Sequence, residues 1–217
     1  MPTGQLIAGV LPGPAGDLEF MLQLPLAPGA RAALVCHPHP LHGGTLHTRI
    51  VYHLARGFYE MGMPVLRFNF RGVGKSAGEY GFGHGEVDDL AAALAFLRQR
   101  FPVPIVLAGF SFGSVMALRY LARQDDRGIE RLVAAGLPVD REPLPQELAW
   151  RGPKLLISGD RDEFASPAGL EAACARLEEP KRMLWFPGAD HFLNGRMDEL
   201  RRRLAENLDF DRVPALG

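Results

Sequence analysis

The sequence predicts an α/β fold in which helices cover both faces of a mostly parallel sheet. Short runs rich in Val, Ile, Leu and Phe alternate along the chain with longer amphipathic segments, and this alternation is typical of strands buried between two helical layers. The 217 residues are 47% hydrophobic, which is enough for one substantial core. No repeat, low-complexity tract or linker divides the chain. We therefore expect one domain over residues 1–217.

Seven short apolar runs predict the strands. Together they are rich in Val, Ile, Leu and Phe, as buried strands of a parallel sheet are. The expected strands are 18–24, 32–37, 64–70, 104–109, 130–136, 154–159 and 182–186.

Amphipathic segments between these runs predict five helices. Apolar residues recur at intervals of three and four in 47–61 and 86–100, which places them on one helical face. The remaining helices are expected at 112–123, 167–178 and 194–208.

Charge and composition exclude several classes of function. Lysine and arginine total 24 against 25 acidic residues, so a net charge of −1 offers no electrostatic footprint for nucleic acid or an anionic membrane. The first residues lack a basic segment and are interrupted by Gly and Pro, which argues against a signal peptide or membrane span. We expect a cytoplasmic protein. Cys36 and Cys174 are too far apart in sequence for a metal or redox motif and are expected to be core residues.

The stretch Gly74-Lys75-Ser76 resembles the end of a phosphate-binding loop. Such a loop needs a glycine five places before Gly74 and a helix after the serine. Asn69 occupies the first position, and the glycine-rich residues after Ser76 begin a helix poorly. The sequence therefore disfavours a nucleotide site, and the long loop 71–85 at the end of a predicted strand is expected to form a wall of the active site.

A Gly-x-Ser-x-Gly motif lies where a predicted strand meets a predicted helix. It spans Gly109 to Gly113 and places Ser111 at its centre. This is the pattern of a nucleophile elbow, in which small residues two places on either side allow the strand and helix to approach closely. The motif predicts Ser111 as a catalytic nucleophile.

A serine hydroxyl needs a histidine base and a carboxylate that orients it. Downstream of Ser111, the candidate base is His191, which follows the strand at 182–186. Asp162 is the preferred carboxylate because it lies a few residues into the loop after the strand at 154–159. Asp160 and Asp190 remain alternatives, with Asp160 expected to cap the turn.

The segment after the strand at 32–37 contains His37, His39, His42 and His47. Dense histidines suggest a metal site, but no carboxylate adjoins them, the neighbouring Cys36 is expected to be a core residue, and prolines fix the backbone between the histidines. An oxyanion hole is the preferred interpretation. It would use the backbone NH of Phe112, which follows the nucleophile, and the NH of His39, because Pro38 and Pro40 have none.

Four motifs together resemble the small, lidless bacterial α/β-hydrolases. They are HPHP..GG at His37 to Gly44, RFNFRGVG.S.G at Arg67 to Gly78, G.GE..D at Gly83 to Asp89 and GFSFG at Gly109 to Gly113. The resemblance spans nearly the whole chain and implies the α/β-hydrolase fold with a Ser-Asp-His triad. In that family a G-x-x-D pattern and a late histidine match Gly159–Asp162 and His191, and the short Pro-rich connection 139–152 leaves no room for a lid.

The sequence thus predicts a cofactor-free serine hydrolase that acts on small, short-acyl carboxylic esters. A thioesterase and a small amidase or peptidase would use the same groups. A nucleotide-binding protein and a binding module without catalysis are alternatives from other classes. The oligomeric state does not follow from the sequence. Arg71 is expected to pair with Glu86 or Asp89, or to be solvated, and His53 and His84 are expected to be surface or structural residues.

Overall fold

The computed structural model describes residues 4–145 and 147–212, and within them eight strands form one sheet. The strand order is β1-β2-β4-β3-β5-β6-β7-β8. Strands β3 to β8 run parallel, whereas β1 and β2 form an antiparallel hairpin whose second strand pairs with β4. The bounds are β1 Gln5–Gly13, β2 Gly16–Leu24, β3 Ala32–Cys36, β4 Val65–Phe68, β5 Ile105–Phe110, β6 Ile129–Ala135, β7 Lys154–Gly159 and β8 Lys181–Phe186.

All seven predicted strands are present, and β1 is the strand that the sequence did not predict. Its residues include Gly9 and Pro12, which usually argue against a strand interior. At the edge of a sheet a proline costs no ladder hydrogen bond. Here β1 is the outermost strand and pairs with β2 alone, so its position makes this composition acceptable.

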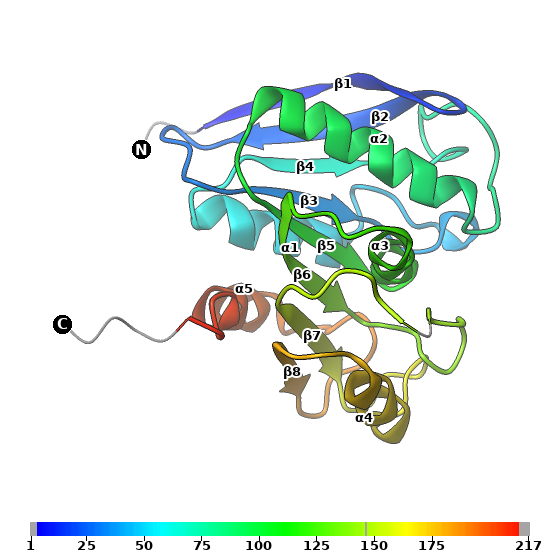
Figure 1. Ribbon diagram of the computed structural model, residues 1–217, viewed down its shortest axis with the longest axis vertical. Coiled ribbons are helices and arrows are strands. Elements are labelled where there is room, and N and C mark those ends of the chain that lie inside the picture. Colours follow the sequence, from blue (N-terminus) through cyan, green and yellow to red (C-terminus); the bar gives the residue numbers. More distant parts are fainter. Residues whose placement is uncertain (1–3, 146, 213–217) are drawn as a thin grey trace.

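The five predicted helices are confirmed and cover both faces of the sheet. Helices α1 (Arg49–Glu60) and α5 (Met197–Asn207) pack together on one face. On the other face lie α2 (Gly85–Arg100), α3 (Phe112–Arg123) and α4 (Pro167–Arg176), which are nearest the viewer in Figure 1. One short 3-10 turn, η1 (Pro40–His42), follows β3.

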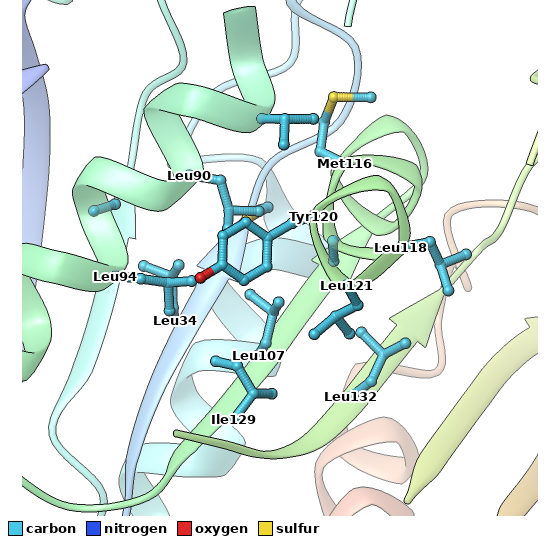
Figure 2. Close-up of a cluster of buried hydrophobic side chains, with 14 of the residues drawn as sticks. Leu34, Leu90, Leu94, Leu107, Met116, Leu118, Tyr120, Leu121, Ile129 and Leu132 are labelled. Carbon is cyan, nitrogen blue, oxygen red and sulfur yellow. The ribbon is translucent and has the colours of Figure 1, made fainter. Parts of the chain in front are cut away.

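Alternating strand residues divide the core into two layers. Leu34 and Leu107 face α2 and α3, whereas their neighbours Val35 and Val106 face α1 and α5. Figure 2 shows the first layer, where the ring of Tyr120 on α3 packs among leucines from α2 and from the sheet. Because both faces are covered, the central strands are buried along their whole length, which explains their unbroken apolar sequences.

The parallel strands align their carboxyl ends at one edge of the sheet. The loops after β3, β5, β7 and β8 leave from this edge and carry His39, Ser111, Asp162 and His191 respectively. Open α/β sheets place their ligands at this edge. In the part of the chain that the structure describes, no helix is long and apolar enough to cross a membrane.

Candidate active site

Ser111 sits on a strained turn between β5 and α3. Its φ of 54° and ψ of −121° lie in a region that residues other than glycine rarely adopt. A backbone hydrogen bond of 2.9 Å from the Ser111 NH to the Ala135 carbonyl ties the turn to β6. The surrounding fold thus holds Ser111 in the conformation expected of a nucleophile elbow.

The two glycines of the motif are required by close backbone approach. A Cβ atom at Gly109 would overlap the backbone of Gly113, and one at Gly113 would overlap the carbonyl oxygens of Cys36 and His37. Strand β5, helix α3 and the end of β3 therefore pack too closely for any side chain at either position. The steric prediction made from the sequence is confirmed.

His191 and Asp162 form a buried pair. Nδ1 of His191 lies 2.8 Å from Oδ2 of Asp162, and both side chains are almost fully inaccessible to solvent. Asp162 also accepts hydrogen bonds from the Phe164 NH at 2.8 Å and from the Ser158 hydroxyl at 3.4 Å. A carboxylate at Nδ1 favours the tautomer with the proton on Nδ1, which leaves Nε2 free to accept a proton.

The two alternative carboxylates have other partners. Asp160 accepts a hydrogen bond of 2.6 Å from the Gly188 NH, which agrees with its expected role in the turn. Asp190 binds the backbone NH and the side-chain amide of Asn194, and the backbone hydrogen bond is the main reason that its pKa is below the usual range. Of the three candidates, the structure pairs Asp162 with His191.

Aromatic rings enclose the His191 imidazole. The ring centroids of Phe110, Phe164 and Phe192 lie 4.9, 4.6 and 5.2 Å from it. Gly136 makes room on another side: it has a φ of 54°, and a Cβ there would overlap the Phe110 ring and lie 3.1 Å from Cε1 of His191. Sequence reasoning missed Gly136, although a glycine directly after a buried strand signals a close backbone approach.

The oxyanion hole is expected to use the backbone NH groups of His39 and Phe112. Among the described residues, neither the His39 NH nor the Phe112 NH has a hydrogen-bond acceptor. The two residues are neighbours, because the His39 imidazole lies 4.9 Å from the Phe112 ring. Both residues line the cavity that contains Ser111, so their backbone NH groups are candidate donors to an oxyanion.

His39 also holds its own loop in place. Its Nδ1 accepts a hydrogen bond of 3.2 Å from the Leu41 NH at the start of η1, and its Nε2 lies 3.1 Å from the Tyr80 hydroxyl. The imidazole stacks on His42 at 4.4 Å. Burial, followed by the nearby His42, lowers the pKa of His39. A neutral imidazole suits this arrangement, because Nδ1 can accept only when it carries no proton.

His37 makes a second set of backbone contacts. It is fully buried, its Nδ1 donates to the Pro38 carbonyl at 2.6 Å, and its Nε2 accepts from the Phe70 NH at 3.0 Å. Burial lowers its pKa to about 4. In residues 4–145 and 147–212, no group of three or more His, Cys, Asp or Glu side chains is arranged to hold a metal ion.

A cavity of about 570 Å³ connects these groups. Ser111, His191, His39 and Phe112 all line it. The structure therefore brings four of the five predicted site residues to one cavity, and the fifth, Asp162, lies directly behind His191.

Loop 71–85 does not line the cavity, so its predicted role as an active-site wall is wrong. It lies one layer behind the wall and touches it through Tyr80, whose hydroxyl faces His39. Arg71 forms two charge-assisted hydrogen bonds with the fully buried Asp89, at 2.9 and 2.7 Å. The buried Glu86 accepts from the Gly81 and Gly83 NH groups. The loop thus braces the His39 segment.

The Gly74-Lys75-Ser76 stretch uses its amides within the protein. The Lys75 NH donates to Glu19 and the Ser76 NH to the Val73 carbonyl. The Ser76 hydroxyl donates to the Asn69 carbonyl and accepts from the Glu19 NH. These groups fasten the loop to β2 and are not arranged to cradle a phosphate.

Comparison with known proteins identifies the family and the fold. The sequence model of the family described as "Serine aminopeptidase, S33" matches residues 33–146. An α/β serine hydrolase homologue from Coxiella burnetii is 36% identical, with a TM-score of 0.86 over 96% of this chain and 99% of that one. A lidless α/β serine hydrolase from Xanthomonas campestris is 33% identical, with a TM-score of 0.88 over 100% of this chain and 99% of that one.

Sequence comparison adds a third relative. An uncharacterized protein of Rickettsia prowazekii is 32% identical over 212 residues, which are 90% of this chain and 86% of the relative. The family match covers more than half of the chain, and the two similar structures cover 96% and 100% of it. The chain therefore belongs to the S33 serine aminopeptidase family of α/β serine hydrolases and has the lidless form of that fold.

Proposed function

We propose that the protein is a carboxylesterase that cleaves small esters with short acyl chains through an acyl-enzyme. One observation carries the proposal: the buried His191–Asp162 pair, 2.8 Å apart, lies beside the same cavity as the strained Ser111 elbow. A serine, a free imidazole nitrogen and a carboxylate at these positions are the parts of a catalytic triad.

In the first half of the reaction, the Ser111 hydroxyl attacks the ester carbonyl carbon while Nε2 of His191 accepts the hydroxyl proton. Asp162 keeps the Nδ1 proton in place and stabilises the imidazolium. The NH groups of His39 and Phe112 donate to the oxyanion that forms. The protonated His191 then gives its proton to the leaving alcohol, and the acyl group remains on Ser111.

In the second half, water attacks the acyl-enzyme. His191 accepts a proton from the water, the same two NH groups hold the new oxyanion, and the proton returns to Ser111 as the carboxylic acid leaves. No cofactor takes part in this scheme.

The size and cover of the cavity support a small substrate. A volume of about 570 Å³ is typical of sites for small molecules. The described residues of the connection 139–152 form no helix or strand over it. Pro138, Phe164 and Phe192 provide apolar walls that suit a short acyl chain.

A thioesterase and an amidase or peptidase remain alternatives because the same groups would serve them. An aminopeptidase also needs an anion for the substrate ammonium group. Glu142 lines the cavity but lies 3.6 Å from Arg119, which offsets its charge. This contact favours an ester over an N-terminal peptide.

A fluorophosphonate probe followed by peptide mass spectrometry tests the proposal. It should label Ser111, and Ser111→Ala should lose both labelling and turnover of p-nitrophenyl acetate. Ser166→Ala, which removes a helix-cap serine of α4, is the matched control and should retain both. Parallel assays with a thioester and an aminoacyl p-nitroanilide rank the three reactions. Labelling at another residue, or full turnover by Ser111→Ala, would refute the proposed nucleophile, and absence of labelling would favour a non-catalytic binding module.

A further inference from the structure

Two charged side chains line the mouth of the active-site cavity, and their surroundings differ. Arg141 and Glu142 both come from the connection between β6 and β7. Glu142 lies 3.6 Å from Nη2 of Arg119 on α3. In residues 4–145 and 147–212, no carboxylate lies within ion-pair distance of the Arg141 guanidinium. Arg141 is therefore the uncompensated permanent charge among the residues that line this cavity.

Aromatic contacts place Arg141 close to the proposed base. Its guanidinium carbon lies 5.9 Å from the centroid of the Phe164 ring. The His191 imidazole also lies beside that ring, with 4.6 Å between the ring centroids. The backbone NH of Phe164 donates to Asp162, so the backbone at Phe164 is tied to the same carboxylate that contacts His191. A cation thus lies one aromatic ring away from the reacting centre.

We propose that Arg141 binds an anionic group of the substrate, so that the preferred substrates are small esters that carry a carboxylate. This inference rests on the proposed esterase function. The planar guanidinium can donate two parallel hydrogen bonds to a carboxylate, which orients the bound carboxylate as well as attracting it. The apolar walls of Phe164 and Phe192 would receive the short chain between the carboxylate and the scissile carbonyl.

The expected preference for carboxylate-bearing esters is moderate because Arg141 is exposed. Exposed ion pairs contribute little and weaken with salt. We therefore expect kcat/KM to favour a carboxylate-bearing ester over its neutral isostere by about fivefold at low ionic strength. The preference should decrease at high salt and lie mainly in KM, because the carboxylate is bound equally in the ground state and the transition state.

The test compares three methyl esters of equal length: monomethyl adipate, its neutral carboxamide methyl adipamate, and the cationic methyl aminohexanoate. Two acetate esters extend the comparison: one carries a carboxylate on its alcohol group, and the other carries a carboxamide at the same place. For each protein variant, the measured quantity is the ratio of kcat/KM between charged and neutral esters. Arg141→Gln should bring the ratio for monomethyl adipate close to one, and Arg141→Glu should reverse it in favour of the cationic ester.

Arg151→Gln is the matched control. Arg151 belongs to the same connection, is more than three-quarters exposed, pairs with Glu178 and does not line this cavity. Its loss changes the net charge equally and should leave the ratio unchanged. A preference on the acyl or on the alcohol side supports the inference and shows which part of the ester lies beside Phe164.

Three results would overturn the inference. One is an equal kcat/KM for charged and neutral esters, both when the charge is on the acyl group and when it is on the alcohol. Another is a carboxylate preference that persists in Arg141→Glu, and the third is a preference for the cationic ester, which would assign recognition to Glu142. Turnover of neutral esters without a charge preference would refute only this inference. Absence of turnover of every ester would refute it together with the proposed function.

Discussion

Nε2 of His37 accepts a hydrogen bond of 3.0 Å from the backbone NH of Phe70. The contact joins the ends of β3 and β4 beneath the segment that carries His39. It requires an unprotonated Nε2, and Nδ1 already donates to Pro38. The buried imidazole must therefore stay neutral for the two strand ends to remain connected.

The free energy of unfolding should accordingly depend on pH through His37. Burial lowers its pKa from the ordinary 6.5 to about 4 in the folded protein. Between these values the unfolded chain binds more protons, so stability decreases as the pH falls from 6.5 to 4. One pKa unit corresponds to about 1.4 kcal/mol, so this side chain alone should remove about 3 kcal/mol over that range.

Urea denaturation at pH 7 and pH 4.5 measures this effect. His37→Gln keeps an acceptor for the Phe70 NH and does not titrate. It should be less stable at pH 7 by about 1 kcal/mol, because the hydrogen bond to Pro38 is lost, yet lose less stability on acidification than the parent protein. His47→Gln, at an exposed position, is the control. An equal loss on acidification in His37→Gln and the parent would contradict this prediction.

Asp162→Asn should lower kcat by about three orders of magnitude or more. An amide at this position no longer stabilises the imidazolium and can hold His191 in the wrong tautomer. Asp160→Asn is the matched control, because Asp160 binds the Gly188 NH outside the triad. It should lower kcat by less than about tenfold. The measurement is steady-state hydrolysis of p-nitrophenyl acetate by both variants, with circular dichroism to verify folding. A larger loss in Asp160→Asn would move the carboxylate assignment to that residue.

His39→Ala should lower kcat more than His39→Asn. The alanine removes the acceptor for the Leu41 NH and frees the segment whose NH is the proposed oxyanion donor. We expect a decrease of about tenfold, below the hundredfold or more that follows outright loss of such a donor. Asparagine can accept from the NH two residues on, as in an Asx turn, and should restore most of the rate.

The pH profile separates the role of His39 from general destabilisation. Its pKa is lowered by burial and by His42, so protonation below the ordinary range should break the Leu41 contact and reduce kcat as the pH falls. Asparagine does not titrate, so His39→Asn should retain a larger fraction of its neutral-pH rate in acid. Identical relative profiles for the parent and His39→Asn would show that this imidazole does not control the loop.

The chain length of the acyl group provides a test of the cavity. Because the cavity has about 570 Å³ and the described connection 139–152 forms no lid, p-nitrophenyl acetate and butyrate should have a higher kcat/KM than the dodecanoate ester. Added lipid surface should not activate the enzyme. A preference for acyl groups of about twelve carbons or more, measured as a ratio of kcat/KM, would contradict the proposed short-acyl specificity.

What the sequence could predict follows from local chemistry. The buried strands are unbroken apolar runs, and Gly109 and Gly113 identify the elbow because no side chain fits there. The offset after β7 favours Asp162 over Asp160, and the contact between Asp162 and His191 agrees with this prediction. Each of these inferences depends on residues close together in sequence or on strand ends that a parallel sheet must align.

The rest depends on contacts between segments distant in sequence. The sequence predicts that loop 71–85 lines the cavity, but contacts with Asp89 and with Glu19 on β2 determine its position. Nothing in the sequence of the loop shows whether it lines the cavity or supports the segment that lines it. The sequence likewise does not show that Arg141 lacks a carboxylate partner among the described residues, because Arg119 is brought to Glu142 only in the folded chain.

Lys75 and Asp89 contribute unequally to the support that loop 71–85 gives to the His39 segment. The Lys75 side chain is exposed, and its backbone NH already binds Glu19, so Lys75→Ala should change kcat/KM for an ester by less than about twofold and stability by less than about 0.5 kcal/mol. Asp89→Asn removes the buried charge opposite Arg71 and should destabilise the protein by about 3 kcal/mol. Urea denaturation and ester hydrolysis measure both variants.

Calorimetry with ATP or GTP and Mg²⁺ tests separately whether the loop binds a nucleotide, because a phosphate-binding loop would lose affinity in Lys75→Ala. Micromolar nucleotide binding that disappears in this variant would refute the brace, even if Ser111 remained reactive.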